Sequence, residues 1–216
     1  MADSPKSFFL TPEIHDYVVA HGTPPDAAQQ ALIEETAQLP MAQMQIAPEQ
    51  GAFMTLLVRA IAPATRWRSV RSLAIRRSRS RCFPDDGHLR MTSEEWTAIA
   101  RRAWDAAGVA HKIELKLAPA LDTLRALPAE EHLDLAFVDA DKPAYAAYYE
   151  ELLPRLKPNG LILVDNTLWS GVIVDDAVTD DNTVALRAFN DMVAADDRVD
   201  VSLLTLGDGL TLIRKK

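Results

Sequence analysis

The chain has 216 residues, of which 48% are hydrophobic and 25% are charged, a composition typical of a globular domain. Its formal net charge of −8 argues against a general affinity for nucleic acids or anionic membranes, because both repel an acidic protein. The single cysteine, Cys82, excludes an intrachain disulfide, and residues 1–9 lack the apolar stretch of a signal peptide. We therefore expect one cytoplasmic domain over residues 1–216.

The first 62 residues are predicted to be helical. Thr11-Pro12-Glu13 combines a capping hydroxyl, a first-turn proline and an acid, which is a typical helix start. Thr23-Pro24-Pro25-Asp26 predicts a second helix that ends near Leu39-Pro40. Pro48-Glu49-Gln50 predicts the start of a third helix, whose apolar residues fall on one face.

From Ser93 onward, predicted helices alternate with predicted strands. Helical periodicity and capping residues predict helices over 93–107, 119–127, 143–156 and 182–195. Short apolar runs predict strands over 112–117, 133–138 and 161–164, a turn over 157–160, and a hairpin over 200–204 and 210–213. This alternation predicts an α/β fold with a mainly parallel sheet covered by helices on both faces. Ligands of such folds bind at the carboxyl ends of the strands.

Two of the predicted strands end in acidic side chains. Asp139 follows the strand over 133–138, and Asp165, with Asn166 directly after it, follows the strand over 161–164. Two carboxylates and an amide oxygen form a donor set that suits Mg²⁺, Ca²⁺ or Mn²⁺ better than zinc. Strand-end aspartates also commonly cap the following helix or stay solvated. The residue types alone leave both interpretations open.

Two further side chains near these strand ends could take part in chemistry. Lys142, three residues after Asp139, could act as a general base if burial or a cation lowers its pKa. The alternative is a solvated lysine at a helix start. Trp169 could form one wall of a pocket for an aromatic substrate, or it could pack in the core or at an interface.

These segments resemble the caffeoyl-CoA and catechol O-methyltransferase family, whose members use a divalent cation and S-adenosylmethionine. The signatures are Phe-Val-Asp-Ala-Asp-Lys at 137–142 and Val-Asp-Asn-Thr-Leu-Trp at 164–169. Residues 45–51 and the glycine turn at 206–210 are also similar to the family. The resemblance implies a Rossmann-like methyltransferase fold with a mostly parallel seven-stranded sheet, helices on both faces and an antiparallel C-terminal strand. Helices of residues 1–62 would cover the site of a core formed by 63–216.

The resemblance also implies roles for particular residues. Asp139, Asp165 and Asn166 would hold a divalent cation, usually Mg²⁺, which acidifies a hydroxyl of a catechol-like or hydroxylated aromatic acceptor. Lys142 would accept the proton, with Asp139 beside it, and Trp169 would contact the acceptor. The positions that match the S-adenosylmethionine pocket of the family are Ile46, Ala120, Asp139 and Asp141. Family members form homodimers, and neither nucleic acid nor membrane is expected as a partner.

One segment departs from the family pattern. The family has a first strand and loop of the form Val-Glu-Val-Gly-Thr-Phe-Thr-Gly-Tyr-Ser, whose glycines let the backbone approach the cofactor. Residues 66–81 instead contain seven arginines and no glycine. The acidic residue that binds the ribose hydroxyls is also missing around 90–92. A chain with this sequence is therefore predicted to have a disturbed first strand and weak cofactor binding.

The Arg-rich segment, residues 66–81, has several interpretations. Codons can be chosen for it that encode the family segment once their first two bases are discarded, so a reading-frame slip is the favoured hypothesis. The segment could also be a basic arm for RNA, although Trp67 is its only aromatic residue, or a solvated helix face. A catalytically impaired protein that keeps the fold and the metal site is a further alternative.

Overall fold

The computed structural model describes residues 10–39, 42, 45–61, 94–112 and 119–216. The Arg-rich segment lies outside these ranges, as do residues 113–117 of a predicted strand and the region around 90–92. The predictions made for those segments therefore stay predictions.

Three helices precede the Arg-rich segment, and each begins where the capping residues predict. They are α1 (Pro12–His21), α2 (Ala27–Ala37) and α3 (Pro48–Ile61). Thr11 Oγ1 accepts a hydrogen bond from the Ile14 amide at the start of α1. Asp26 and Gln29 form a reciprocal capping box at the start of α2, which satisfies amides that the helix itself leaves without a partner.

The later elements alternate between helix and strand as expected. The helices are α4 (Glu94–Ala106), η3 (Ala110–Lys112), α5 (Ala120–Arg125), η4 (Lys142–Ala144), α6 (Tyr145–Leu152), η5 (Leu153–Arg155), η6 (Trp169–Val174) and α7 (Asp181–Ala194). The strands are β1 (Leu133–Val138), β2 (Leu156–Asp165), β3 (Val199–Leu204) and β4 (Leu210–Lys215). The bounds of β1 agree with the predicted strand at both ends.

The predicted helix over 143–156 was too long, because only Tyr145–Leu152 is α-helical. Short 3₁₀ turns flank it, and Pro143 and Pro154 lie in these turns. A proline lacks the amide hydrogen that an α-helix needs, so the α-helical segment is confined between the two prolines.

The four described strands form one mixed sheet in the order β1-β2-β4-β3. Strands β1 and β2 are parallel, whereas β4 is antiparallel to both β2 and β3. The predicted C-terminal hairpin and its antiparallel last strand are thus confirmed. Since β1 and β2 are parallel neighbours, their carboxyl ends lie at the same edge of the sheet.

The turn predicted over 157–160 was wrong, because β2 begins at Leu156. The pairing with β1 jumps from Leu133↔Leu156 to Leu135↔Leu161, so the extra residues form a bulge in β2. Asn159 takes up the left-handed conformation there, with φ of 64°. The turn-forming residues therefore distort a strand instead of ending it.

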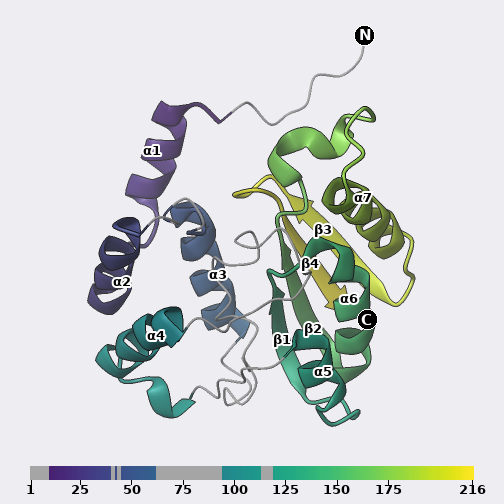
Figure 1. Cartoon of the computed structure of the whole chain (residues 1–216), viewed down its shortest axis with the longest axis horizontal. Helices are drawn as coiled ribbons and strands as arrows, with labels where there is room; N and C mark the ends of the chain where they lie inside the picture. Colours follow the sequence, from purple (N-terminus) through teal and green to yellow (C-terminus); the bar gives the residue numbers. More distant parts are fainter. Residues whose placement is uncertain (1–9, 40–41, 43–44, 62–93, 113–118) are drawn as a thin grey trace.

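The two faces of the sheet are covered by different helices (Figure 1). One face packs against α5, α6 and α7 and forms the larger core, which includes Val138, Ile162 and Leu186. The other face presents Phe137 and Leu163, which pack with Leu210 and with apolar residues of α3. This division follows from the alternation of side chains along a strand. Helix α3 is thereby fixed to the sheet although it belongs to the N-terminal segment.

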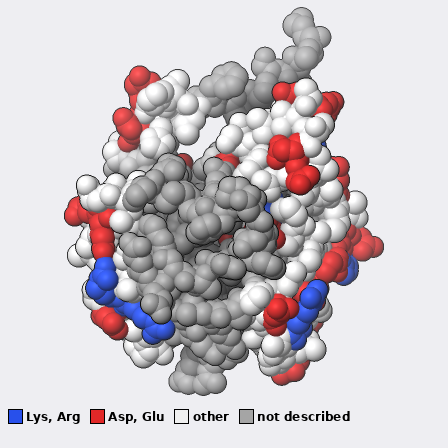
Figure 2. Space-filling view, viewed as in Figure 1, with Lys and Arg blue, Asp and Glu red and all other residues white. Residues whose placement is uncertain are grey.

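Charge on the described surface is mainly acidic, and Figure 2 shows Asp and Glu side chains at several places around the rim of this view. None of the helices in the described ranges is both long and apolar enough to cross a bilayer.

Candidate functional site

Asp139 and Asp165 lie together at the carboxyl edge of the sheet. They directly follow or end the paired strands β1 and β2, in which Val138 is the partner of Val164. Asp139 is 8% exposed and Asp165 is 4% exposed. Two buried carboxylates at one sheet edge need compensating donors or cations, because an isolated buried charge is strongly unfavourable.

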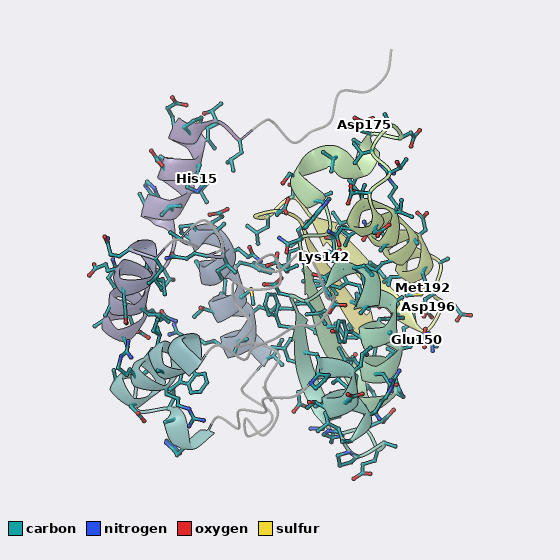
Figure 3. All side chains as sticks on the ribbon, in the orientation of Figure 1. His15, Lys142, Glu150, Asp175, Met192 and Asp196 are labelled. Atoms are coloured by element: carbon teal, nitrogen blue, oxygen red, sulfur yellow. The ribbon has the colours of Figure 1, made fainter. Side chains whose placement is uncertain are left out.

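Lys142 supplies a positive charge between these strand ends (Figure 3). Its side chain is 3% exposed, so the alternative of a solvated lysine is excluded. The ammonium Nζ lies 3.4 Å from Asp139 Oδ1 and donates a hydrogen bond of 2.8 Å to Asn166 Oδ1. A cation thus already lies against two of the three predicted metal-binding side chains.

The hydroxyl of Tyr145 also contacts this ammonium, and the sequence patterns did not identify this residue. Its hydroxyl accepts a hydrogen bond from Lys142 Nζ and donates one of 3.0 Å to the backbone carbonyl of Asp165. Burial, followed by the nearby Asp139 carboxylate, raises the pKa of Tyr145 well above its ordinary value of 10. The phenol therefore stays protonated and links β2 to the start of η4.

The two carboxylate oxygens of Asp165 are in different surroundings. Oδ1 accepts hydrogen bonds from the Asn166 amide at 2.8 Å and from Gln50 Nε2 at 3.0 Å. Burial, followed by the Asp139 carboxylate, raises the pKa of Asp165 to about 6, against the opposing effect of those two donors. The site thus holds a carboxyl that changes its charge just below neutral pH.

Asn166 owes its orientation to an unusual backbone conformation and to the turn between β3 and β4. Its φ of 58° is left-handed, which asparagine tolerates better than most residues. Its Nδ2 donates to Asp208 Oδ2 at 3.2 Å, which leaves Oδ1 directed at Lys142. Asp208 also accepts a hydrogen bond from the Ser170 amide, so it joins the turn to the loop after β2.

Trp169 belongs to that loop. Lys142 Nζ lies 5.6 Å from the centre of its ring, so the indole flanks the site. The ring also packs partly against the larger core, as the alternative interpretation predicted. Both interpretations therefore describe part of the environment of Trp169.

The residues predicted to contact the cofactor lie on three segments. Ile46 precedes α3, Ala120 is the buried first residue of α5, and Asp141 follows Asp139 after β1. The Asp141 carboxylate accepts a hydrogen bond of 2.7 Å from the hydroxyl of Tyr148 on α6. Both Asp139 and Asp141 thus lie just beyond the same strand.

The side chains at this edge fit a hard cation by their chemistry. All three predicted ligands offer oxygen, and the buried ammonium of Lys142 shows that a positive charge is stabilised beside them. Within the described residues, no group of three or more His, Cys, Asp or Glu side chains is placed to bind a metal. The predicted set has only two carboxylates, so an amide and other oxygen ligands would have to complete it.

Sequence comparison places the chain among methyltransferases. The family model described as "O-methyltransferase" matches residues 24–216. "Caffeoyl-CoA O-methyltransferase 2" of Zea mays is 35% identical over an aligned length of 225 residues, covering 97% of this chain and 85% of the maize protein. "Probable caffeoyl-CoA O-methyltransferase 2" of Dictyostelium discoideum is 46% identical over 127 residues, covering 57% of this chain. That alignment spans 55%, about half, of the Dictyostelium relative.

Solved structures of methyltransferases have a similar α/β fold. SAH-bound methyltransferase PaMTH1 of Podospora anserina superposes with a TM-score of 0.75 at 26% identity, covering 97% of this chain and 99% of that one. An O-methyltransferase of Bacillus cereus in complex with SAH gives a TM-score of 0.72 at 25% identity, covering 94% and 97%.

Proposed function

Because the chain belongs to the O-methyltransferase family, we propose that it transfers a methyl group from S-adenosylmethionine to a hydroxyl of a catechol-like aromatic molecule, with the help of a divalent cation. The observation that carries this proposal is that Asp139 and Asn166 both contact the buried Nζ of Lys142, next to Asp165. The names of the plant and Dictyostelium relatives support an aromatic acceptor.

Asp139, Asp165 and Asn166 would hold the cation, which fits their oxygen donors. When bound, a divalent cation such as Mg²⁺ lowers the pKa of an acceptor hydroxyl. The protein excludes water around this point, because both carboxylates and Lys142 are almost fully buried. Low water content strengthens the electrostatic interactions that such a reaction depends on.

With a divalent cation bound beside it, which favours the neutral amine over the ammonium, Lys142 would accept the proton of the acceptor hydroxyl at Nζ. Hydrogen bonds to Tyr145 and Asn166 fix the position of Nζ, so less conformational entropy is lost when the reacting groups are brought together. The acceptor oxygen then forms a bond to the methyl carbon while the bond between that carbon and the sulfonium sulfur breaks. Trp169 would lie along the aromatic ring of the acceptor.

Ile46, Ala120, Asp139 and Asp141 would line the S-adenosylmethionine pocket, in keeping with the SAH reported for two structural relatives. We also propose the remaining family features for this chain, namely a seven-stranded sheet, a homodimer and a cytoplasmic location. The domain division into N-terminal helices (1–62) and core (63–216) is part of the same proposal.

A methyl-transfer assay with a simple catechol tests the proposal. Because weak cofactor binding is predicted, product is expected at high concentrations of S-adenosylmethionine with Mg²⁺, and addition of excess chelator should abolish it. Asp165→Asn should lower kcat/KM by at least a hundredfold, whereas Asp191→Asn, which changes an exposed carboxylate on α7, should leave it unchanged. Turnover that is insensitive to both chelator and Asp165→Asn would contradict the role of the cation.

A further inference from the structure

Gln50 is a buried polar side chain at the start of α3. It is 2% exposed, and its Nε2 donates a hydrogen bond of 3.0 Å to Asp165 Oδ1. The two residues are 115 positions apart in the chain, so this contact joins the N-terminal segment to the strand-end site. Hydrogen bonds between a buried donor and a charged acceptor are among the stronger ones in proteins.

The donors around Asp165 are distributed unevenly. Gln50 and the Asn166 amide both donate to Oδ1. Within the described part of the chain, no hydrogen bond reaches Oδ2. A carboxylate with two donors on one oxygen is restrained in its rotation, and its second oxygen stays available to a cation.

Gln50 has little room to move. Apolar residues of α3, including Phe53, Met54 and Leu57, pack on the sheet beside it. The turn between β3 and β4 also lies against its amide, because a Cβ added at Gly207 would lie only 2.4 Å from Gln50 Oε1. The helix and the turn together therefore fix the position of the donor.

We propose that Gln50 is a positioning residue, which aims Oδ2 of Asp165 at the cation by holding Oδ1. This inference rests on the proposed function, since it assumes that Asp165 binds the cation. It adds a role for α3, which would couple the packing of the N-terminal helices to the affinity of the site for a divalent ion.

Direct measurement of Mn²⁺ binding, without cofactor or acceptor, tests the inference. Free Mn²⁺ can be quantified by electron paramagnetic resonance during titration of the protein. Gln50→Met keeps the side-chain length but removes the donor, and we expect it to weaken Mn²⁺ binding about tenfold or more, as the loss of a hydrogen bond to a charged group would. Methyl transfer by this variant should recover when Mn²⁺ is raised by the same factor.

Met54→Ala is the matched control, because it loosens α3 on the sheet without touching Asp165. It should lower the thermal midpoint but leave Mn²⁺ affinity unchanged. Equal affinity of Gln50→Met and the parent, or equal weakening by Met54→Ala, would overturn the role of Gln50. If Gln50→Met does not fold, Gln50→Leu provides the same test, because it also removes the donor without adding a charge or a ligand beside Asp165.

Failure of the proposed function can be distinguished from failure of the inference about Gln50. If the parent binds no Mn²⁺, or if Asp165→Asn binds it as well as the parent, the cation site itself is refuted and the role of Gln50 falls with it. If the parent binds Mn²⁺ through Asp165 and Gln50→Met binds it equally, only the inference about Gln50 is refuted.

Discussion

At the scale of single residues, the charge of Asp165 opposes folding in the absence of a cation. Burial and the Asp139 carboxylate raise its pKa to about 6 in the folded protein, whereas an unfolded chain has an ordinary carboxyl pKa near 4. The folded state therefore binds the proton more tightly. The stabilisation of the protonated form is fully present below about pH 4 and is lost as the pH rises towards about 6.

This linkage predicts the behaviour of Asp165→Asn in metal-free buffer. The variant has no titrating carboxyl at this position, so it does not lose stability as Asp165 ionises. Relative to the parent, its free energy of unfolding should therefore rise between about pH 4 and pH 7, by roughly 3 kcal/mol for a pKa difference of about two units. Urea denaturation at a series of pH values measures the difference. A constant difference over this range would show that Asp165 titrates normally.

The residues at the site were predictable to different extents. Asp139, Asp165 and Asn166 directly follow or end apolar runs, so their place at the sheet edge could be inferred from the order of elements. Gln50 could not be found in this way, because only the folded chain brings it to a partner 115 residues away. Tyr145 carries no signal in the sequence that separates a buried hydrogen-bonding phenol from an ordinary core aromatic.

At the scale of elements, the turn between β3 and β4 and the loop after β2 approach each other closely. Gly209 has φ of 89°, and a Cβ there would lie 2.4 Å from the Leu168 backbone nitrogen. That nitrogen donates to the Asp208 carbonyl, and the Thr167 amide donates to the Gly209 carbonyl. The turn can therefore approach the loop only with glycine at position 209.

Gly209→Ala is expected to destabilise the protein for two reasons, backbone strain and this clash. Gly171→Ala is the control for strain alone, since Gly171 has φ of 81° but no atom within 4 Å of an added Cβ. We expect a loss of about 1 kcal/mol for Gly171→Ala and at least about twice that for Gly209→Ala. Equal losses in chemical denaturation would show that the loop yields to the added methyl group.

The loop that carries Trp169 is held by one side chain of α7. Arg187 donates to the backbone carbonyls of four residues in or just after η6: Val172, Ile173, Asp175 and Val178. A guanidinium can serve four acceptors because its five donors form a rigid planar fork. This side chain therefore replaces the regular hydrogen bonds that the loop lacks.

Arg187→Lys keeps the charge but cannot reach all four carbonyls. We expect hydrogen–deuterium exchange at 172–178 to become several-fold faster, while α7 keeps its protection because Asp180 still caps it. Arg214→Lys, on an exposed part of β4, serves as the control. Unchanged exchange at 172–178 would show that the loop is held by packing instead.

Some elements were easier to predict than others for physical reasons. The apolar run of β1 lies between polar residues, so both its ends are visible in the sequence, and the capping residues mark the starts of α1 and α2. The start of β2 was missed because Asn159 and Gly160 usually form turns, whereas here they lie in a bulge between Leu156 and Leu161, which both pair with β1. Tertiary hydrogen bonds here overrule a local preference.

At the scale of the whole molecule, we predict that the Arg-rich segment weakens the binding of S-adenosylmethionine. Replacing it with a stretch that contains Val-Glu-Val-Gly-Thr-Phe-Thr-Gly-Tyr-Ser should tighten binding at least tenfold in calorimetric titration, because the glycines allow close approach of the backbone. The intact mass of each protein should be verified beforehand. Equally tight binding by the arginine-containing protein would contradict the predicted loss.

The hydrogen bond between Gln50 and Asp165 also bears on how the molecule assembles. It joins two residues that are more than a hundred positions apart, so forming it costs the chain entropy of closing a long loop. Such distant contacts form more slowly than contacts between residues close in the sequence. Local elements such as the hairpin of β3 and β4 can form earlier. During refolding, the ability to capture Mn²⁺ should therefore return later than the far-ultraviolet circular dichroism signal, so ion capture would report the last stage of folding.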